Sequence, residues 1–130
     1  MPTARITTVA GRTIQEKQAM ITVVSEAVER IMDRNQKYIR VIIDEYPPEN
    51  YALMGITFKD RREGGNSDLA QDDIIMELFI KAGRTPEEID ALSDAFMAEL
   101  KKYPTFTQGD IRIIVTEMAA ANFKIDFYVN

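Results

Sequence analysis

The sequence predicts an α+β fold in which two fused β-α-β units pair into one four-stranded sheet with two helices on one face. Two stretches of the chain share the order strand, helix, strand. Each stretch carries the same Gly-Arg-Thr turn, and the turns are 72 residues apart, the separation of Gly11 from Gly83. With 130 residues, the chain has the length of one ordinary domain. We therefore expect a single domain, 1–130, made of two repeats.

The composition excludes several classes of protein. At 45% hydrophobic and 28% charged residues, the chain can bury a real core. It has no cysteine and no histidine, so disulfides, thiolate catalysis and histidine bases are excluded. A net charge of −5 argues against nucleic acid as a partner. No apolar run approaches the roughly 20 residues that span a bilayer, and no signal peptide is evident. We expect a cytoplasmic protein that does not bind membranes.

The first repeat is assigned to residues 1–58. Thr13 and Glu16 have the spacing of a capping box, which predicts a helix start directly after the first strand. The apolar residues that follow recur at helical spacing on one face. The expected elements are a strand over 3–9, a helix from Thr13 to about 33–35, a strand over 38–43 that ends before Pro47-Pro48, and a loop over 49–58 with a short strand near Gly55.

The second repeat is assigned to residues 72–130, after a polar, glycine-bearing connector over 59–71. Thr85 and Glu88 form another capping box, and Pro86 suits the first helical position. The expected elements are a strand over 74–80, a helix with its apolar stripe at Leu92, Phe96 and Leu100, and a closing strand over 111–115.

The two repeats align without a gap, which indicates a fused duplication. Pro2 is the exception, because the equivalent position in the second repeat is Ile74. The matched pairs include Arg12 with Arg84, Thr13 with Thr85, Glu16 with Glu88, Arg40 with Arg112, Glu45 with Glu117, and Tyr51 with Phe123.

A strand–helix–strand unit predicts two parallel strands with a right-handed crossover, and two such units can pair antiparallel. The strands over 38–43 and 111–115 do not alternate cleanly between apolar and polar residues. Both faces of the sheet therefore look buried, which favours an oligomer built around the sheets.

Pro2 offers unusual chemistry. Removal of Met1 would leave proline as the first residue, with a free secondary amine. Among apolar groups and near cations, such an amine loses its proton near neutral pH and can act as a general base without any histidine.

Pro2, the two Gly-Arg-Thr turns, and the stretches Ile39-Arg40-Val41-Ile42-Ile43 and Ile113-Ile114-Val115-Thr116-Glu117 together resemble the tautomerase superfamily. The pattern is most similar to the 4-oxalocrotonate tautomerase group, in its double-length, fused form. The resemblance implies a tautomerase/MIF-like fold, no metal, no cofactor, and a homotrimer that is a pseudo-hexamer of β-α-β units.

The resemblance also implies site residues. The catalytic residues would be Pro2, Arg84 and Arg40, and the substrate-binding residues would be Lys81, Arg112, Phe123, Arg12 and Ile125.

Position in the family pattern implies a role for each residue. Arg84 would serve Pro2 within one chain, and Lys81 stands where dehalogenase relatives place a second arginine. The strand arginine would come from a neighbouring chain, as either Arg40 or Arg112. For both arginines, a salt bridge to Glu45 or Glu117, respectively, is an equally good interpretation.

Three further positions follow from the same pattern. Phe123 corresponds to the aromatic wall of the pocket, although a plain core role is as good. Ile125 stands where the dehalogenase branch has a water-activating glutamate. Arg12 would face Ile74, where no amine exists, so it is either a relic or a ligand for another group.

The implied function is keto–enol tautomerisation of a small anionic substrate, such as 2-hydroxymuconate or phenylenolpyruvate. One alternative is a hydratase, dehalogenase or decarboxylase of the same fold that uses a protonated proline. The other is a non-catalytic oligomeric binding protein.

Overall fold

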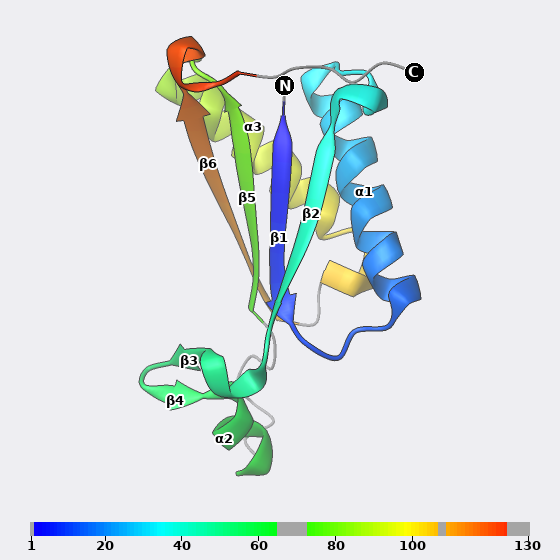
Figure 1. Cartoon of the computed structure of the whole chain (residues 1–130), viewed down its shortest axis with the longest axis vertical. Coiled ribbons are helices and arrows are strands. Elements are labelled where there is room, and N and C mark those ends of the chain that lie inside the picture. The colour runs from blue at the N-terminus through cyan, green and yellow to red at the C-terminus, as the bar shows by residue number, and fades with distance from the viewer. Residues whose placement is uncertain (1, 65–72, 107–108, 125–130) are drawn as a thin grey trace.

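The computed structural model describes residues 2–64, 73–106 and 109–124 (Figure 1). Its strands are β1 (Thr3–Val9), β2 (Arg40–Tyr46), β3 (Ala52–Leu53), β4 (Ile56–Thr57), β5 (Asp73–Lys81) and β6 (Asp110–Met118). Its α-helices are α1 (Ile14–Met32), α2 (Phe58–Glu63) and α3 (Pro86–Leu100). Single turns of 3₁₀ helix cover Gln36–Tyr38, Pro48–Asn50, Pro104–Phe106 and Ala120–Asn122.

The main sheet has four strands in the order β2-β1-β5-β6. Within each repeat the strands are parallel, β1 with β2 and β5 with β6. The central pair, β1 with β5, is antiparallel and joins the repeats. Both long helices lie behind the sheet in the view of Figure 1, on one of its faces. The predicted α+β topology is therefore confirmed.

Both long helices begin as their sequences predict. The hydroxyls of Thr13 and Thr85 accept a hydrogen bond from the backbone N–H three residues later, and the glutamate at that position completes each capping box. The glycines before these caps have φ angles of 113° at Gly11 and 131° at Gly83, which side chains rarely tolerate. The repeated Gly-Arg-Thr motif is thus a turn that requires glycine.

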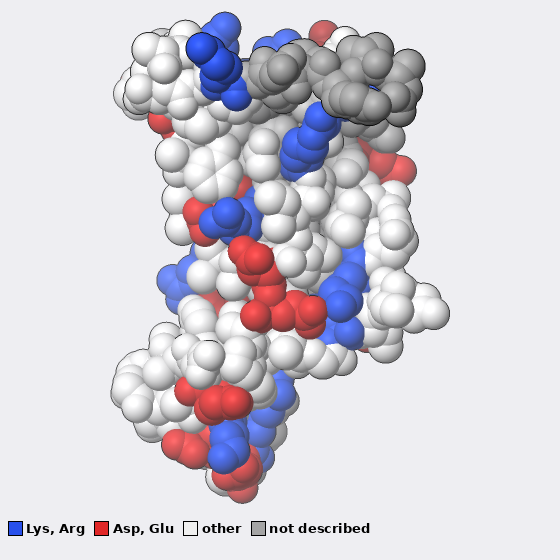
Figure 2. All heavy atoms as spheres, viewed as in Figure 1, with Lys and Arg blue, Asp and Glu red and all other residues white. Residues whose placement is uncertain are grey.

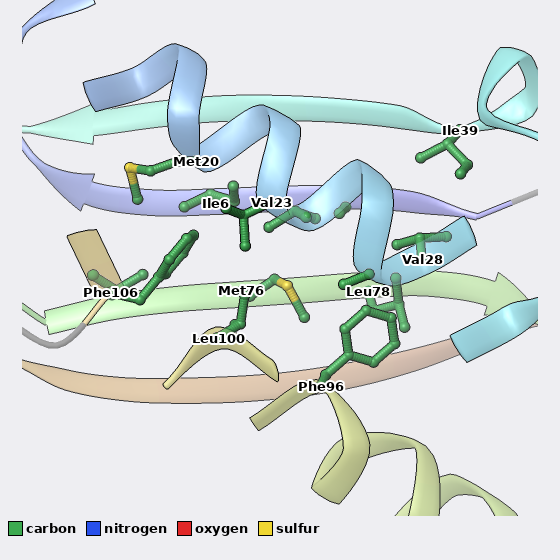
Figure 3. Packing of buried hydrophobic residues seen from close by; sticks show 14 of the residues in the cluster. Ile6, Met20, Val23, Val28, Ile39, Met76, Leu78, Phe96, Leu100 and Phe106 are labelled. Carbon is green, nitrogen blue, oxygen red and sulfur yellow. The ribbon is translucent and has the colours of Figure 1, made fainter. Parts of the chain in front are cut away.

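The core lies between the sheet and the two helices (Figure 3). Side chains of Met20 and Val23 on α1 and of Phe96 and Leu100 on α3 point toward the strands. Other fully buried members are Ala4, Ile6, Val24, Ala27, Val28, Ile74, Met76, Leu78 and Phe106. Burial of this apolar surface holds the two repeats together as one unit.

The second strand of the first repeat differs from its predicted range. The stretch expected to begin the strand at Tyr38 forms a 3₁₀ turn, and β2 instead runs over Arg40–Tyr46. The strand continues to the residue directly before Pro47-Pro48, where the ladder loses its N–H donors.

Residues 47–64 form a lobe beyond one end of the sheet (Figure 1). The short strand predicted near Gly55 is confirmed, but a helix stands where only a connector was expected in this lobe. A β3–β4 hairpin and α2 build it. Thr57 caps α2 by accepting from the N–H of Asp60, and the buried Arg61 donates to the carbonyls of Leu53 and Ile56. Hydrogen bonds between side chains and the backbone, together with the fully buried ring of Phe58, therefore hold the lobe.

The face of the sheet opposite the helices is open in the single chain. Apolar Ile42 and Ile114 are 43% and 48% exposed there. Figure 2, which views this face, shows acidic and basic residues interspersed with uncharged ones. Arg5 lies on it, paired with Asp44 at 3.3 Å and 6.0 Å from the ring centre of Phe79. Across residues 2–64, 73–106 and 109–124, no helix is long and apolar enough to cross a membrane.

Candidate active site

The sheet register brings the predicted site residues from both repeats to one end of the molecule. Thr3 pairs with Phe79 on one side and with Arg40 on the other. One residue further along the same antiparallel register, Pro2 lies opposite Ile80. The Pro2 carbonyl accepts a hydrogen bond from the Arg40 backbone N–H at 3.3 Å, and the residue is buried. The start of β1 is therefore next to the end of β5 and the start of β2 (Figure 1).

The turn that carries Arg84 is held by a carboxylate from β6. Glu117 Oε2 accepts from the backbone N–H groups of Gly83 at 3.2 Å and Arg84 at 3.4 Å. The turn then enters the α3 capping box, where the backbone N–H of Thr85 is the main cause of a lowered pKa at Glu88, with Arg84 a smaller one. These bonds fix the Arg84 backbone in place beside the end of β5.

The Arg84 side chain itself is lightly held. Its Nη1 donates to the Lys81 carbonyl at 3.5 Å, the outer limit of a hydrogen bond, and the residue is half-buried. Lys81 is exposed at the last position of β5. A guanidinium with this freedom can donate to a carboxylate from outside the chain.

Arg40 is exposed at the start of β2. Its Nη1 donates to the Lys37 carbonyl at 3.1 Å, and within the part of the chain that the structure describes it forms no ion pair. The salt bridge to Glu45 that the sequence left open is absent there, because Glu45 instead binds Lys17 Nζ at 3.0 Å. Basic side chains are visible at this end of the sheet in Figure 2.

Arg112, the counterpart of Arg40, lies at the opposite end of the sheet. Its Nε donates to both carboxylate oxygens of Asp73 at 3.2 Å. The alternative of a bridge to Glu117 is wrong, since Glu117 is bound to the Gly83–Arg84 turn. The structure therefore places only Arg40 of the two strand arginines near Pro2 within a chain.

Arg12, the counterpart of Arg84, is bound by its own repeat. Its side chain is only 5% exposed; Nε donates to Thr8 Oγ1 at 2.8 Å and Nη1 to Glu16 at 3.3 Å. Ile74, the residue in place of a second proline, is fully buried. These contacts give Arg12 a structural role at the end of the sheet remote from Pro2.

The aromatic and aliphatic positions of the predicted pocket follow β6. Phe123 is half-buried after the 3₁₀ turn Ala120–Asn122, and its N–H donates to the Ala120 carbonyl at 3.4 Å. Ile125 lies outside the described residues.

Sequence reasoning missed one polar cluster. The buried Asp73 accepts from Arg112 and from the hydroxyl of Tyr51, and it contacts Tyr46 through its backbone. The 72-residue repeat could have indicated this cluster, since it aligns Asp73 with Met1, directly before Pro2, and Tyr51 with Phe123.

Comparisons with known proteins point in one direction. A family model described as tautomerase enzyme matches residues 2–61. The 2-hydroxymuconate tautomerase of Pseudomonas putida is 37% identical over 60 residues, which cover 46% of this chain and 95% of that protein. The protein of the same name from Stutzerimonas stutzeri is 37% identical over 59 residues, 45% of this chain and 94% of that protein.

Solved structures resemble the chain over 95% of its length. The crystal structure of Pt0534 inactivated by 2-oxo-3-pentynoate superposes with a TM-score of 0.74 at 19% identity, covering 95% of this chain and 90% of that one. The symmetric trimer of wild-type Q0 fused 4-OT gives 0.70 at 18% identity, with 95% and 90% covered. At these identities the likeness establishes the double-length fold.

Proposed function

The chain belongs to the tautomerase family, a family of isomerases, and from this premise we propose that it transfers a proton between oxygen and carbon on small anionic enols and 2-oxo acids. Suitable substrates are 2-hydroxymuconate and phenylenolpyruvate. The base is the amine of Pro2 after removal of Met1. No cofactor takes part in this scheme.

One observation carries the proposal: the sheet register sets the start of β1 beside the end of β5. Pro2 then lies at the same end as Lys81 and Arg84, although 79 and 82 residues separate them in sequence. In the other repeat the corresponding arginine is bound to Thr8 and Glu16. The proposed base and the Arg84 side chain, which makes one long hydrogen bond to a backbone carbonyl, therefore lie at the same end of the sheet.

The proposed reaction needs one base and a clamp for the substrate carboxylate. The Pro2 nitrogen accepts the proton of the 2-hydroxyl group, and the electron pair moves into the enol double bond, or through the diene of 2-hydroxymuconate, to form the ketone. The resulting prolinium returns the same proton to C3 or C5, so the substrate is isomerised and the enzyme is regenerated. Arg84 and Lys81 hold the carboxylate by charge-assisted hydrogen bonds and stabilise the developing enolate.

The same surroundings favour a neutral amine. An ordinary terminal amine has a pKa of about 7.7–8.0. In the proposal, burial of Pro2 and the positive charges of Arg84 and Lys81 both disfavour the protonated form of this amine. A larger fraction of the amine is then available as base at pH 7.

We assign the strand arginine of the site to Arg40. Arg112 is bound to a buried carboxylate, whereas Arg40 donates only to a backbone carbonyl among the described residues. The half-exposed Ile42 and Ile114 on the open face support a homo-oligomer, and the similar fused 4-OT chain is a trimer. We propose a homotrimer in which packed sheets enclose the Pro2 end.

The test is kinetic. Ketonisation of 2-hydroxymuconate and phenylenolpyruvate is followed by ultraviolet absorbance for the wild type and Pro2→Ala, with intact mass confirming that Met1 is absent from both. Loss of a proline base should lower kcat/KM by about 10²–10⁴-fold. Equal rates for the two proteins would refute the role of Pro2. Turnover of haloacrylates or acetylenic acids without ketonisation would instead indicate a hydratase or dehalogenase.

A further inference from the structure

The duplication gives the Pro2 end a counterpart at the opposite end of the sheet. There the equivalents of Met1 and Pro2 are Asp73 and Ile74. Arg112 replaces Arg40 beside them, since it pairs with Ile75 as Arg40 pairs with Thr3. Tyr51 takes the position of Phe123. The second end thus keeps a strand arginine and an aromatic residue but has no terminal amine.

A carboxylate of the chain itself occupies this second end. The Asp73 side chain is 1% exposed, and both of its oxygens accept from Arg112 Nε at 3.2 Å. Its Oδ2 also accepts from the Tyr51 hydroxyl. Burying a carboxylate costs folding free energy unless the group is paired with a cation and hydrogen-bonded. Arg112 and Tyr51 provide this pairing and hydrogen bonding for Asp73.

Asp73 also anchors the 47–64 lobe, through its carboxylate to Tyr51 and through its backbone to Tyr46. The Tyr46 hydroxyl donates to the Asp73 carbonyl at 3.0 Å and accepts from its N–H at 3.1 Å. The Tyr46 and Tyr51 rings stack with centroids 4.8 Å apart, and Tyr51 stacks on Phe58 of α2 at 4.9 Å. Through its side chain and its backbone, Asp73 therefore connects the sheet, the edge strand β6 and the lobe.

We propose that Asp73 closes the second site of the duplication: its carboxylate occupies the position between Arg112 and Tyr51 that a small carboxylate ligand would otherwise take, and it ties the 47–64 lobe to the sheet. Removing this side chain creates a site for a small free carboxylate. The inference rests on the repeat and on the Asp73 contacts, not on proton transfer by Pro2, so the two proposals can fail separately.

The ionisation of the partners agrees with this arrangement. Burial, together with the hydrogen bond to Asp73, raises the pKa of Tyr51 to about 12, so its hydroxyl stays a donor. The hydrogen bond to Asp73 also raises the pKa of Arg112. Both groups therefore remain protonated and can donate hydrogen bonds to a carboxylate.

Chemical rescue tests the proposal. Asp73→Ala should melt about 10 °C below the wild type, because it leaves its partners without their buried acceptor. About 0.2 M sodium formate should raise the melting temperature of Asp73→Ala by about 3 °C or more relative to the same concentration of sodium chloride. The wild type should gain nothing from formate, and neither should Asp110→Ala, which removes an exposed carboxylate paired with Asp73 in the β5–β6 register.

Two results would overturn the proposal: an Asp73→Ala protein as stable as the wild type, or one that formate stabilises no more than it stabilises Asp110→Ala. If Asp73→Ala does not fold, Tyr51→Phe provides the second test. Amide exchange over residues 48–63 should then accelerate while exchange in β1 and β5 stays unchanged. Unaltered exchange in the lobe would contradict the anchoring role of Asp73.

Discussion

Replacing the two turn arginines separately distinguishes a substrate ligand from a structural residue. Arg84→Ala removes a guanidinium whose side-chain bond is 3.5 Å long, so we expect the free energy of unfolding to fall by no more than about 0.5 kcal/mol. A charge-assisted hydrogen bond to a substrate carboxylate contributes about 1.5–3 kcal/mol. Its loss should lower kcat/KM by about 10- to 150-fold.

Arg12→Ala is the matched control, because the duplication places it in the same turn of the other repeat. Its side chain is 5% exposed and bonded to Thr8 and Glu16, so its removal should cost about 1–3 kcal/mol of stability. We expect its kcat/KM to stay within about threefold of the wild type.

The assay combines ketonisation rates with denaturant unfolding for both variants. We expect opposite effects, with activity lost in Arg84→Ala and stability lost in Arg12→Ala. A substrate-binding role for Arg84, with a structural role for Arg12, is refuted if Arg12→Ala loses activity as severely as Arg84→Ala while remaining fully stable, or if Arg84→Ala is as active as the wild type.

Other variants extend the same reasoning. Arg40→Ala should lower kcat/KM by about 10-fold or more at nearly unchanged stability. Arg112→Ala should instead lower stability at nearly unchanged kcat/KM, since it leaves the buried Asp73 without its cation. Equal losses of activity in the two variants would contradict the assignment of Arg40 to the site. Phe96→Ala should lose about 3–5 kcal/mol in urea unfolding, because the ring is fully buried; a loss below about 1 kcal/mol would contradict its place in the core. The pKa of Tyr51 rises to about 12 from about 10 in the unfolded chain, so its contribution is complete below pH 10 and is lost as pH rises through 12. The two-unit difference is worth about 2.7 kcal/mol, which solvent screening of this partly exposed group reduces to about 1 kcal/mol; Tyr51→Phe should show a smaller alkaline loss in unfolding titrations at pH 9–12, and an identical loss would contradict this linkage.

Local signals in the sequence predict the framework of this fold. Thr13 with Glu16 and Thr85 with Glu88 mark both helix starts, because a capping box satisfies backbone donors within four residues of each other. The 72-residue offset then predicts the topology, since two equal units can share one sheet through their first strands. Such features depend on short-range spacing, which a sequence displays directly.

Short-range spacing does not predict the 47–64 lobe or its attachment to the sheet through Asp73. Arg61 stabilises the hairpin through backbone carbonyls, which leave no mark in residue type or period. The contact of Asp73 with Arg112 spans 39 residues, and no spacing rule links them. At the start of α2, Thr57 accepts a hydrogen bond from the backbone N–H of Asp60, a short-range contact like those that begin α1 and α3.

In the candidate site, too, some features can be predicted from the sequence and others depend on tertiary contacts. The positions of Pro2, Arg84 and Lys81 follow from the strand order once the repeats are paired antiparallel. Which strand arginine is available does not follow from the repeat, because Arg40 and Arg112 occupy equivalent positions and differ only in their tertiary partners. Symmetry in the sequence therefore predicts two similar ends, and side-chain pairing makes them different.

Covalent labelling with 2-oxo-3-pentynoate, followed by intact-mass and peptide analysis, tests the central claim most directly. Because a neutral terminal amine is the strongest nucleophile expected here, we expect one adduct per chain, on the peptide that begins with Pro2, together with loss of ketonisation. Two adducts per chain, or a single adduct elsewhere, would contradict the assignment of Pro2 as the base of this chain.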